Sequence, residues 1–415
     1  MRVHVVDPSA YTPPYDHELC RALAAAGAEV ELFTSRFVYG EVPAPAGYER
    51  RELFYRLAHR GGASGRRSRS SQALKLAEHV PDMLRYRRAA RAADIVHFQW
   101  LTVQPLDVHL LPRRRPTDSE AHPPRPKLVL TAHDVLPREP RPGQLAAQRR
   151  LYERFDAVVV HSEHGRGRLL ELGVAPDRVH VIPHGALTHL AELPSGPPVV
   201  GRVGDGASGV LIHTDGPVVL FFGLLRPYKG LDVLLRAWRG VEDKGGNGGK
   251  EDGDGGCERN GSRTGIAGAE LWIAGMPRMN VTTLLADPPP GVRIVPRFIS
   301  DAELPAYFTR ADLVVLPYLE ADQSGVLFTA LAFGKPLLLS DVGGFPEVAA
   351  TGAARTVPAG DSAALREALR ELLADPAALA TMAERARAAA AGPYSWDAIA
   401  HRTLELYRSL CAQPR

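Results

Sequence analysis

Two cations, Arg226 and Lys229, lie between an apolar run that ends at Gly223 and the amphipathic stretch "GLDVLLRAW". Positive side chains near the start of a helix oppose the helix dipole unless an anion binds there. Paired cations and a helix N-terminus both bind phosphate well, so this spacing indicates a phosphate site that includes Gly223. The alternative is a pair of cations that only solvates the start of the helix.

A second segment, "LPYLEADQSGVLFTALAFGKP" at 316–336, offers a partner for these cations. An apolar strand ends there in a polar turn, and "SGVLFTALAFG" predicts a helix closed by Gly334. We expect a diphosphate to bind between the two cations and the backbone N–H groups at this helix start, which belong to Gln323, Ser324 and Gly325. The alternative is an ordinary helix capped by Asp322 or Ser324.

Short β-branched runs that alternate with helical patterns must position these groups. The amino half holds such runs at 2–7, 28–34, 94–100, 127–134, 156–162 and 178–185, and the carboxyl half at 217–223, 270–275, 292–296, 312–318 and 335–341. The runs are apolar on both faces, as in a parallel sheet that is covered on both sides. The alternation predicts an α/β protein with two doubly wound domains.

Ligands of open α/β sheets bind at the carboxyl ends of the strands. Polar or small residues end several predicted strands: His97, His133 with Asp134, His161, His184 with Gly185, and, in the carboxyl half, Gly223, Gly275, Tyr318 and Asp341. With two domains facing one another, we expect the active site in the cleft between them.

Composition also predicts the domain boundaries. The segment 193–209 is rich in Gly and Pro and lacks periodicity, and its "GRVGDG" has neither the glycine spacing nor the following helix of a dinucleotide site. A second Gly-rich segment cannot form a core and is expected to be a disordered insertion. The expected divisions are a first domain at 1–192, a linker at 193–212, a second domain at 213–393 with its insertion at 244–265, and a closing segment at 394–415.

The overall composition is that of a globular protein, with 45% hydrophobic residues and a net charge of +3. No apolar run approaches the roughly 18 residues of a membrane span, and the N-terminus lacks the apolar core of a signal peptide. The three cysteines are far apart, which suits a reducing compartment. We therefore expect a soluble cytoplasmic protein.

Basic residues concentrate in the amino half. Residues 51–150 hold 20 Lys and Arg against 9 Asp and Glu, with "RRSR" at 66–69 and "RRR" at 113–115. Such runs are typical of solvated loops, or of a surface that meets an anionic acceptor or the inner face of a membrane. No aromatic residues are interleaved with them, which disfavours nucleic acid as a partner.

The segments "FFGLLRPYKGLDVLLRAW", "LPYLEADQSGVLFTALAFGKPLLLSDVGGFPEV" and "YSWDAIAHRTLELYRSL" resemble the retaining, GT-B-fold nucleotide-sugar glycosyltransferases of family 4. In the amino half, "TAHDVLP", "VVVHSEHGRGRLLELG" and "VIPHGA" agree with this resemblance. It covers nearly the whole chain except the two Gly-rich segments. It implies two Rossmann-like domains and a closing helix from about residue 395 that braces the first domain through Trp396.

The resemblance also implies roles for individual residues. Arg226 and Lys229 match the pair that neutralises the donor diphosphate. His133 matches a histidine that faces the donor sugar, and Asp134 beside it could orient the ring. Phe298 and Ile299 match the positions where backbone groups of the family contact the nucleobase.

The chain departs from the family pattern at two acidic positions. The family carries two glutamates eight positions apart, the first at the donor sugar and the second at the ribose. Counting back from Gly334 places Ala321 and Thr329 there. Glu320 is one residue away from the first position and is expected to contribute to donor recognition, with Thr329 as a weaker ribose contact. The Gly-Gly loop often found after the first strand is replaced by "PSAYTPPYD".

The sequence thus predicts a glycosyltransferase of the hexosyltransferase type that moves a sugar from a UDP- or GDP-linked donor to an acceptor with retention of configuration. The acceptor is a glycan, a lipid-linked molecule or a small molecule. No strand end shows acidic residues spaced for Mg²⁺, so no metal or other cofactor is expected. The alternatives are a nucleotide-sugar epimerase or hydrolase on the same fold, and a non-catalytic protein that binds sugar nucleotides.

Overall fold

The structure is a computed structural model that describes the chain except for residues 39, 60–68, 113–125, 137–142, 197, 203–209, 212–214, 240, 242–267 and 413–415. It divides into two compact units. Unit 1 comprises Met1–Leu187 with Ala391–Arg415, and unit 2 comprises Thr188–Ala390. The predicted insertion at 244–265 lies outside the described residues, as do the basic runs at 66–69 and 113–115 apart from the backbone of Arg69.

Unit 1 is built on a seven-stranded parallel sheet in the order β3-β2-β1-β4-β5-β6-β7. Its strands are β1 (Arg2–Asp7), β2 (Glu29–Ser35), β3 (Glu49–Phe54), β4 (Ile95–Phe98), β5 (Lys127–Thr131), β6 (Ala157–Val160) and β7 (Val179–Val181). In register, Val5 of β1 pairs with Leu32 of β2 and with His97 of β4. The strand order reverses beside β1, which is the point where doubly wound sheets open a crevice for ligands.

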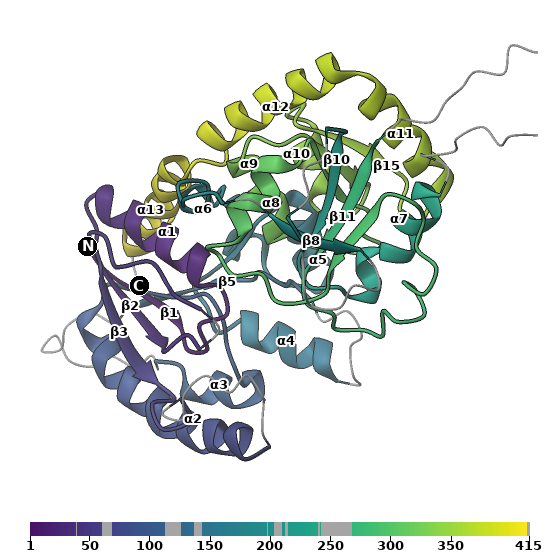
Figure 1. Cartoon of the computed structure of the whole chain (residues 1–415). Helices are drawn as coiled ribbons and strands as arrows, with labels where there is room; N and C mark the ends of the chain where they lie inside the picture. Colours follow the sequence, from purple (N-terminus) through teal and green to yellow (C-terminus); the bar gives the residue numbers. More distant parts are fainter. Residues whose placement is uncertain are drawn as a thin grey trace, which may run out of the picture. The chain divides into compact units, whose positions relative to one another are not determined.

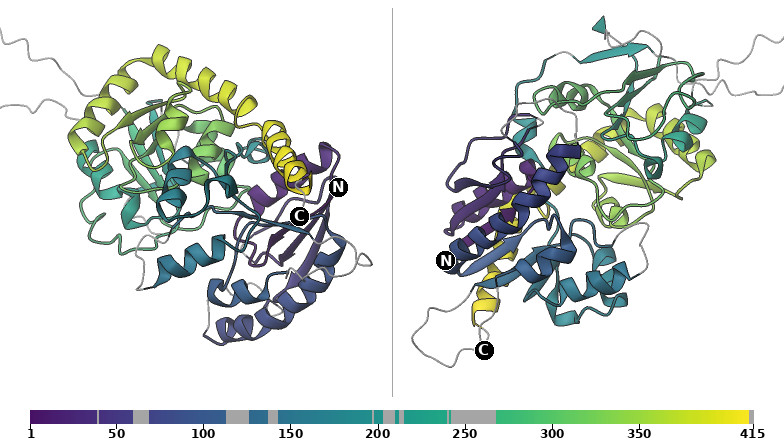
Figure 2. Two further views of the ribbon diagram at one scale, coloured as in Figure 1. Left: turned by 180° about the vertical axis from the view of Figure 1, so that it is seen from behind. Right: turned by 90° about the horizontal axis from the view of Figure 1, so that it is seen from below.

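Helices cover both faces of this sheet (Figures 1 and 2). They are α1 (Pro13–Ala25), α2 (Arg69–Ala89), α3 (Gln104–Leu110), α4 (Gln144–Tyr152), α5 (Glu163–Glu171) and α13 (Trp396–Ala412), with short 3₁₀ turns η1 (Ala90–Ala92) and η2 (Pro176–Arg178). On one face α1 packs against α13, and α2 and α3 lie together on the other. The crossovers β1-α1-β2 and β3-α2-β4 run in opposite directions from the centre of the sheet, which places their helices on opposite faces.

The closing helix is anchored as predicted. The indole N–H of Trp396 donates to the carbonyl of Ala186 at 2.6 Å, and the Trp396 ring lies 5.1 Å from that of Tyr15 on α1. Near the other end of α13, the hydroxyl of Tyr407 lies 2.6 Å from Nδ1 of His97. The predicted closing helix and its tryptophan anchor are confirmed.

Unit 2 contains an eight-stranded sheet in the order β15-β14-β13-β10-β11-β12-β8-β9. Its strands are β8 (Val199–Arg202), β9 (Val210–Leu211), β10 (Val218–Phe222), β11 (Glu270–Ala274), β12 (Val292–Val295), β13 (Leu313–Leu316), β14 (Leu337–Ser340) and β15 (Ala354–Val357). Six strands are parallel, while β8 pairs antiparallel with β12. Both β8 and β9 come from the segment 193–212 that was predicted as a linker, and their strands were not predicted.

Successive side chains of β10 point to opposite faces of the unit 2 sheet, and each face packs against its own helices. The helices of unit 2 are α6 (Thr188–Ala191), η3 (Pro227–Lys229), α7 (Leu231–Trp238), α8 (Leu304–Arg310), α9 (Gly325–Ala332), α10 (Phe345–Ala349), α11 (Ser362–Ala374) and α12 (Pro376–Ala391). Phe221 is buried in a core shared with α7 and α11, whereas the Phe222 ring packs 5.1 Å from Phe308 of α8. These two sheets confirm the predicted α/β class with two doubly wound halves.

No helix in the described ranges is both long enough and apolar enough to cross a membrane.

A buried acidic pair replaces the expected Gly-Gly loop after β1. The carboxylate of Asp7 accepts hydrogen bonds from the backbone N–H groups of Ser9, Tyr11 and Thr12, and so fixes the loop. Asp16 on α1 is fully buried nearby. Burial, followed by the negative charge of Asp7, holds the pKa of Asp16 well above its usual range. The loop is therefore organised by a carboxylate rather than by glycine flexibility.

Replacing Asp16 with Asn should make the protein more stable than the wild type at neutral and alkaline pH. The native state binds the Asp16 proton more tightly than the unfolded chain does. Its contribution to stability is therefore complete below the ordinary carboxyl pKa of 3.8 and is lost as the pH rises through the raised pKa. Urea unfolding at a series of pH values measures the difference between variant and wild type, which should grow with pH.

The matched control is Asp397→Asn, which removes the same charge from the exposed first turn of α13. Its stability relative to wild type should not depend on pH in this way. A constant difference between Asp16→Asn and wild type at every pH would contradict the raised pKa.

Candidate active site

The loop after β10 brings a buried ammonium group to the carboxyl edge of the unit 2 sheet. Gly223 follows the strand with φ of +100°, and a Cβ atom there would lie only 3.0 Å from Nζ of Lys229 and 3.1 Å from the Val326 side chain. Glycine therefore permits an approach that any other residue would obstruct. Lys229 is 7% exposed, and its Nζ lies 5.0 Å from the centre of the Tyr318 ring. The ammonium is thus held by groups from β10, β13 and α9.

Arg226 differs from Lys229 in its surroundings. It precedes the 3₁₀ turn η3, which Lys229 ends. Its side chain is exposed and makes no hydrogen bond or ion pair with any residue that the structure describes. Helix α7 begins only at Leu231, after Gly230, where a Cβ would lie 2.0 Å from the carbonyl oxygen of Pro317. The two cations therefore belong to the 3₁₀ turn η3 and its N-cap, and not to the first turn of α7. The residue that joins η3 to α7, Gly230, packs against the loop after β13.

The start of α9 is open to an anion. Ser324 is the N-cap residue, but its hydroxyl does not cap the helix and lies 3.3 Å from the hydroxyl of Tyr318. Within the described chain, the N–H groups of Gly325 and Val326 have no acceptor. Gly325 is exposed, with open space where a Cβ would lie. The predicted helix is confirmed, and its free N–H groups lie beside the Lys229 ammonium because Val326 contacts Gly223.

Gln323 adds an unpartnered polar atom at this edge. Its side-chain oxygen Oε1 is buried and finds no hydrogen-bond donor among the residues the structure places. A buried acceptor without a partner is unfavourable in a folded protein, and such atoms are frequent where a ligand binds.

The two positions that depart from the family pattern have different environments. Thr329 is 4% exposed, and its hydroxyl donates to the carbonyl of Gly325 in the same helix at 2.9 Å. The hydroxyl proton of Thr329 is therefore engaged in a hydrogen bond within α9. The sequence did not predict this bond. Glu320 is exposed in the turn after β13 and forms no ion pair in the described part of the chain.

The predicted nucleobase contacts lie after β12. Phe298 is 41% exposed, whereas Ile299 is 7% exposed. The carbonyl of Phe298 accepts from the guanidinium of Arg297 at 2.9 Å, and Arg297 also pairs with Glu303. This pairing lowers the pKa of Glu303 to about 2. The hydrogen bonds of Arg297 therefore hold the segment after β12 in place, and the Phe298 side chain is exposed to solvent.

In unit 1, four of the histidines predicted from strand ends form an imidazole cluster, which consists of His97, His133, His161 and His184. His133 and His161 are joined by a contact of 3.1 Å between their nitrogens. The His161 and His184 ring centres are 5.3 Å apart. Burial lowers the pKa of His97 to about 3, of His161 to about 4 and of His184 to about 3. Burial, then the neighbouring imidazoles, also holds the pKa of His133 well below its usual range.

The hydrogen bonds of the cluster fix its tautomers. Nδ1 of His161 faces the carbonyl of Ile182 at 3.0 Å, so it must carry the proton. The neutral His161 then accepts through Nε2 from Nδ1–H of His133. That leaves Nε2 of His133 as an acceptor, 3.1 Å from the carboxamide of Gln99. A carboxamide turned so that its nitrogen faces His133 donates this bond, and the Gln99 nitrogen, otherwise buried without a partner, becomes satisfied.

His133 also packs between aromatic rings. Trp100 stacks on it at 4.9 Å, and Tyr15 meets it edge-on at 4.8 Å. Both of its nitrogens are paired with Gln99 and His161, so the expectation that Asp134 orients the ring was wrong. Gln99 and Trp100 were not predicted as site residues, although both directly follow β4, where the strand-end rule applies.

Two other strand-end predictions have structural roles. His184 donates through Nδ1 to the carbonyl of Gly185 at 2.7 Å. A Cβ at Gly185 would lie 2.3 Å from the indole of Trp396, so this glycine lets the closing helix approach the sheet. The structure thus explains Gly185 by packing.

Replacing Gln99 with Glu should raise the pKa of His133 by about one to three pH units. A carboxylate can only accept, so it favours the Nε2–H form and attracts the imidazolium. Titration of the His133 ring signals by NMR measures the pKa. Gln104→Glu, which places the same charge at the exposed first residue of α3, is the control. An unchanged pKa in Gln99→Glu would contradict the proposed direction of the hydrogen-bond chain.

No group of three or more His, Cys, Asp or Glu side chains in the described ranges is arranged to bind a metal ion.

Two family models match the chain. The one described as Glycosyltransferase Family 4 matches residues 15–189, and the one described as Glycosyl transferases group 1 matches residues 216–375. The D-inositol 3-phosphate glycosyltransferase of Kineococcus radiotolerans is 27% identical over 95% of this chain and 89% of that protein. The α-maltose-1-phosphate synthase of Mycobacterium tuberculosis is 26% identical over 68% of this chain and 73% of that protein.

Solved structures share the fold. Sucrose-phosphate synthase from Thermosynechococcus elongatus has a TM-score of 0.68 at 20% identity and covers 99% of both chains. Anabaena HepE, solved in complex with UDP-glucose, has a TM-score of 0.65 at 16% identity and covers 99% of this chain and 100% of that one. With one family model on each half and two doubly wound sheets, the chain belongs to the family 4 glycosyltransferases, retaining GT-B-fold enzymes that use nucleotide-sugar donors.

Proposed function

We propose that Arg226, Lys229 and the first turn of α9 bind the diphosphate of the donor. The observation that carries this proposal is the buried Lys229 ammonium at Gly223, beside helix N–H groups that have no acceptor in the described chain. A diphosphate placed there would satisfy the N–H groups and interact with both cations. The exposed guanidinium of Arg226 suits the outer, more hydrated side of the diphosphate.

This arrangement would act on the transition state by electrostatics. When the bond between the anomeric carbon and the diphosphate oxygen breaks, negative charge develops on the leaving diphosphate. An ammonium already fixed in a partly dry site stabilises that charge without reorganising. The buried oxygen of Gln323 is an acceptor for a hydroxyl group of the donor.

Further contacts of the donor follow from the family resemblance. We assign Phe298 and Ile299 to the nucleobase, Glu320 to the donor sugar and His133 to the transferred sugar. Because both nitrogens of His133 are paired, a hydrogen bond to the sugar requires Gln99 to release Nε2, or else the ring contacts the sugar by packing. We expect no metal requirement.

The names of the relatives suggest which substrates to test first. A D-inositol 3-phosphate glycosyltransferase and an α-maltose-1-phosphate synthase both carry a phosphorylated polyol or sugar in their names. We propose a UDP-linked hexose as donor, with a GDP-linked one as the alternative, and a phosphorylated polyol or sugar as acceptor. We further propose a cytoplasmic protein whose basic loops contact anionic acceptors or a membrane surface.

A thermal-shift screen of UDP- and GDP-sugars would identify the donor. A donor at 100 times its Kd stabilises the unit that binds it by roughly 2.7 kcal/mol. Product analysis with and without phosphorylated acceptors then separates transfer from epimerisation, hydrolysis or binding without turnover. Only transfer supports the proposed function.

Changing either Lys229 or Arg226 to Ala should lower turnover about 10²–10³-fold, because each variant removes one preorganised positive charge from the leaving group. Initial rates with the identified donor measure this effect. Arg236→Ala on α7 is the matched control, since Arg236 is exposed and paired with Asp232. Wild-type rates in both site variants would end the assignment of the diphosphate site.

Glu320→Ala should weaken donor binding about tenfold, since hydrogen bonds to a carboxylate are worth roughly 1.5–3 kcal/mol. Thr329→Val, which removes only the hydroxyl, should leave donor binding unchanged because that hydroxyl is bonded to Gly325. Calorimetric titration with the donor compares the two variants. Weaker binding in Thr329→Val together with normal binding in Glu320→Ala would reverse these roles.

A further inference from the structure

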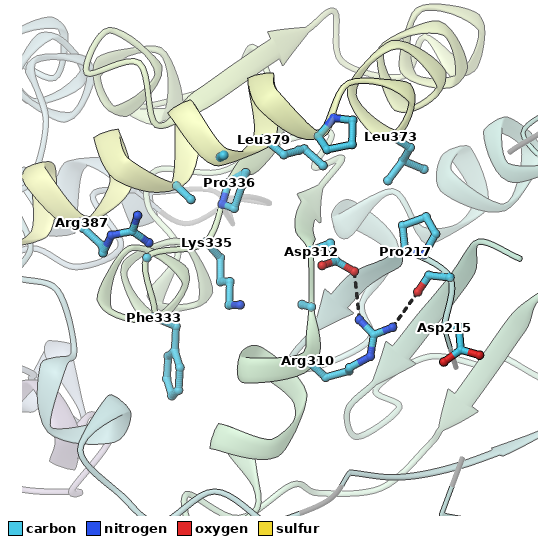
Figure 3. A pocket seen from close by; sticks show the side chains of 16 residues that line it. Asp215, Pro217, Arg310, Asp312, Phe333, Lys335, Pro336, Leu373, Leu379 and Arg387 are labelled. Carbon is cyan, nitrogen blue, oxygen red and sulfur yellow. Dashed lines mark hydrogen bonds and ion pairs between the residues drawn. The ribbon is translucent and has the colours of Figure 1, made fainter. Parts of the chain in front are cut away.

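A cavity lies at the amino ends of the parallel strands of the unit 2 sheet, opposite the carboxyl edge described above (Figure 3). It has a volume of about 580 Å³, which is within the range of small-molecule sites. Its walls are the segments that lead into β10, β13 and β14, together with the junction of α11 and α12. Its lining includes Asp215, Arg310, Asp312, Lys335, Leu373, Leu379 and Arg387.

One wall of the cavity is apolar. Leu373 comes from the end of α11, and Leu379 and Ala383 come from α12, with Pro376 at the junction. Figure 3 shows Leu373 and Leu379 above the charged side chains. A ligand with a carbon body could therefore lie on the α11–α12 junction while a charged group points toward the strand starts.

The same helix, α12, carries an arginine that lines the cavity, Arg387. Arg387 makes no hydrogen bond or ion pair with the residues that the structure describes, and its side chain is exposed. Its aliphatic part packs at Gly334, where a Cβ would lie 2.6 Å from Cγ of Arg387. The guanidinium is thus positioned at the end of α9 by packing rather than by an acidic residue.

Lys335, which precedes β14, is the second cation of the cavity. Its Nζ donates to the carbonyl of Thr309 at 2.9 Å. Burial lowers the pKa of Lys335, Asp312 acts against that effect, and the charges of Arg310 and Arg387 add to it. Two guanidinium groups and one carboxylate therefore act on this ammonium, so a bound anion would relieve an existing repulsion.

The remaining charges of the cavity are mostly engaged in holding the strand starts. Asp312 accepts from the guanidinium of Arg310 at 2.9 Å and from the N–H of Val218 at 2.8 Å. Arg310 also donates to the carbonyl of Gly216 at 2.6 Å, as the dashed lines of Figure 3 show. The lining thus holds three cations, Arg310, Lys335 and Arg387, against the carboxylates of Asp215 and Asp312, so the cavity has an excess of positive charge.

We propose that this cavity binds a small phosphomonoester, with its phosphate at Lys335 and Arg387 and its carbon body on the α11–α12 wall. A phosphomonoester is close to a dianion at neutral pH, which matches two cations, and guanidinium groups bind phosphate oxygens in a bidentate manner. The site is separate from the proposed diphosphate site. The eight residues of α9 separate the two, with Gly325 at one end and Gly334 just beyond the other.

Calorimetric titration of the full-length protein with phenyl phosphate tests the proposal, because this probe combines a phosphomonoester with an apolar body. We expect saturable binding that is about tenfold weaker in Arg387→Gln, the loss expected for one charge-assisted hydrogen bond. Inorganic phosphate should bind more weakly than phenyl phosphate because it cannot use the apolar wall. Ala380→Asp, which adds a carboxylate to the lining, should also weaken binding.

Two controls separate this site from the other anion site and from general charge effects. Arg385→Gln removes the same charge from the same helix, but Arg385 packs at Gly352 and does not line the cavity, so binding should be unchanged. Arg226→Gln should also bind phenyl phosphate normally, whatever becomes of glycosyl transfer. The proposal is overturned if phenyl phosphate does not bind, if Arg387→Gln binds it like wild type, or if only Arg226→Gln loses it.

Discussion

The approach of a lysine ammonium to a glycine backbone determines the geometry of the unit 2 edge. Gly223 has a φ of +100°, and a Cβ there would crowd both Nζ of Lys229 at 3.0 Å and the Val326 side chain of α9 at 3.1 Å, so glycine suits this close approach. Gly223 is in turn packed against the next loop, since a Cβ at Gly275 would lie 1.8 Å from the Gly223 carbonyl. The charge, the helix start and the strand end are therefore fixed relative to one another before any ligand binds. Preorganisation of this kind is what makes a single charge effective in a site.

The carboxyl edge of the unit 1 sheet differs from that of unit 2, because its imidazole cluster carries no charge at neutral pH. Its imidazole cluster is buried, neutral and connected by directed hydrogen bonds that end on the Ile182 carbonyl. Tyr407 of the closing helix bonds to His97, so α13 participates in the same arrangement. The imidazole nitrogens of His97, His133 and His161 are all paired within unit 1, whereas α9 leaves N–H groups open within the described chain. The proposed anion site and the imidazole cluster thus differ in how their polar groups are paired.

The sequence predicted the fold where strands are apolar on both faces, because burial itself produces that pattern. It did not predict β3, whose residues Glu49 to Glu52 are charged, or β15, which is short and only partly buried. It also missed β8, because pairing with β12 is a contact between distant segments that local composition does not encode.

For the site, residue types and family spacing placed Arg226, Lys229 and the α9 start at one sheet edge. The unused cap of Ser324 and the internal bond of Thr329 were beyond sequence reasoning, because side-chain rotamers and neighbouring hydroxyls decide them. The pairing of His133 with Gln99 was missed for a related reason, since it depends on how two adjacent strand ends meet in space.

The charges of β3 have a consequence for the behaviour of the protein in solution. Among the strands that the structure describes, β3 is the outer one of the unit 1 sheet, and one side of its backbone has no neighbouring strand there. Arg51 pairs with Glu31 on β2 at 2.7 Å and with Glu49 at 3.1 Å, so charged side chains crowd this border. A strand from another molecule that approached it would have to desolvate those charges. The charged residues that prevented the prediction of β3 therefore also oppose edge-to-edge pairing of this strand with another molecule.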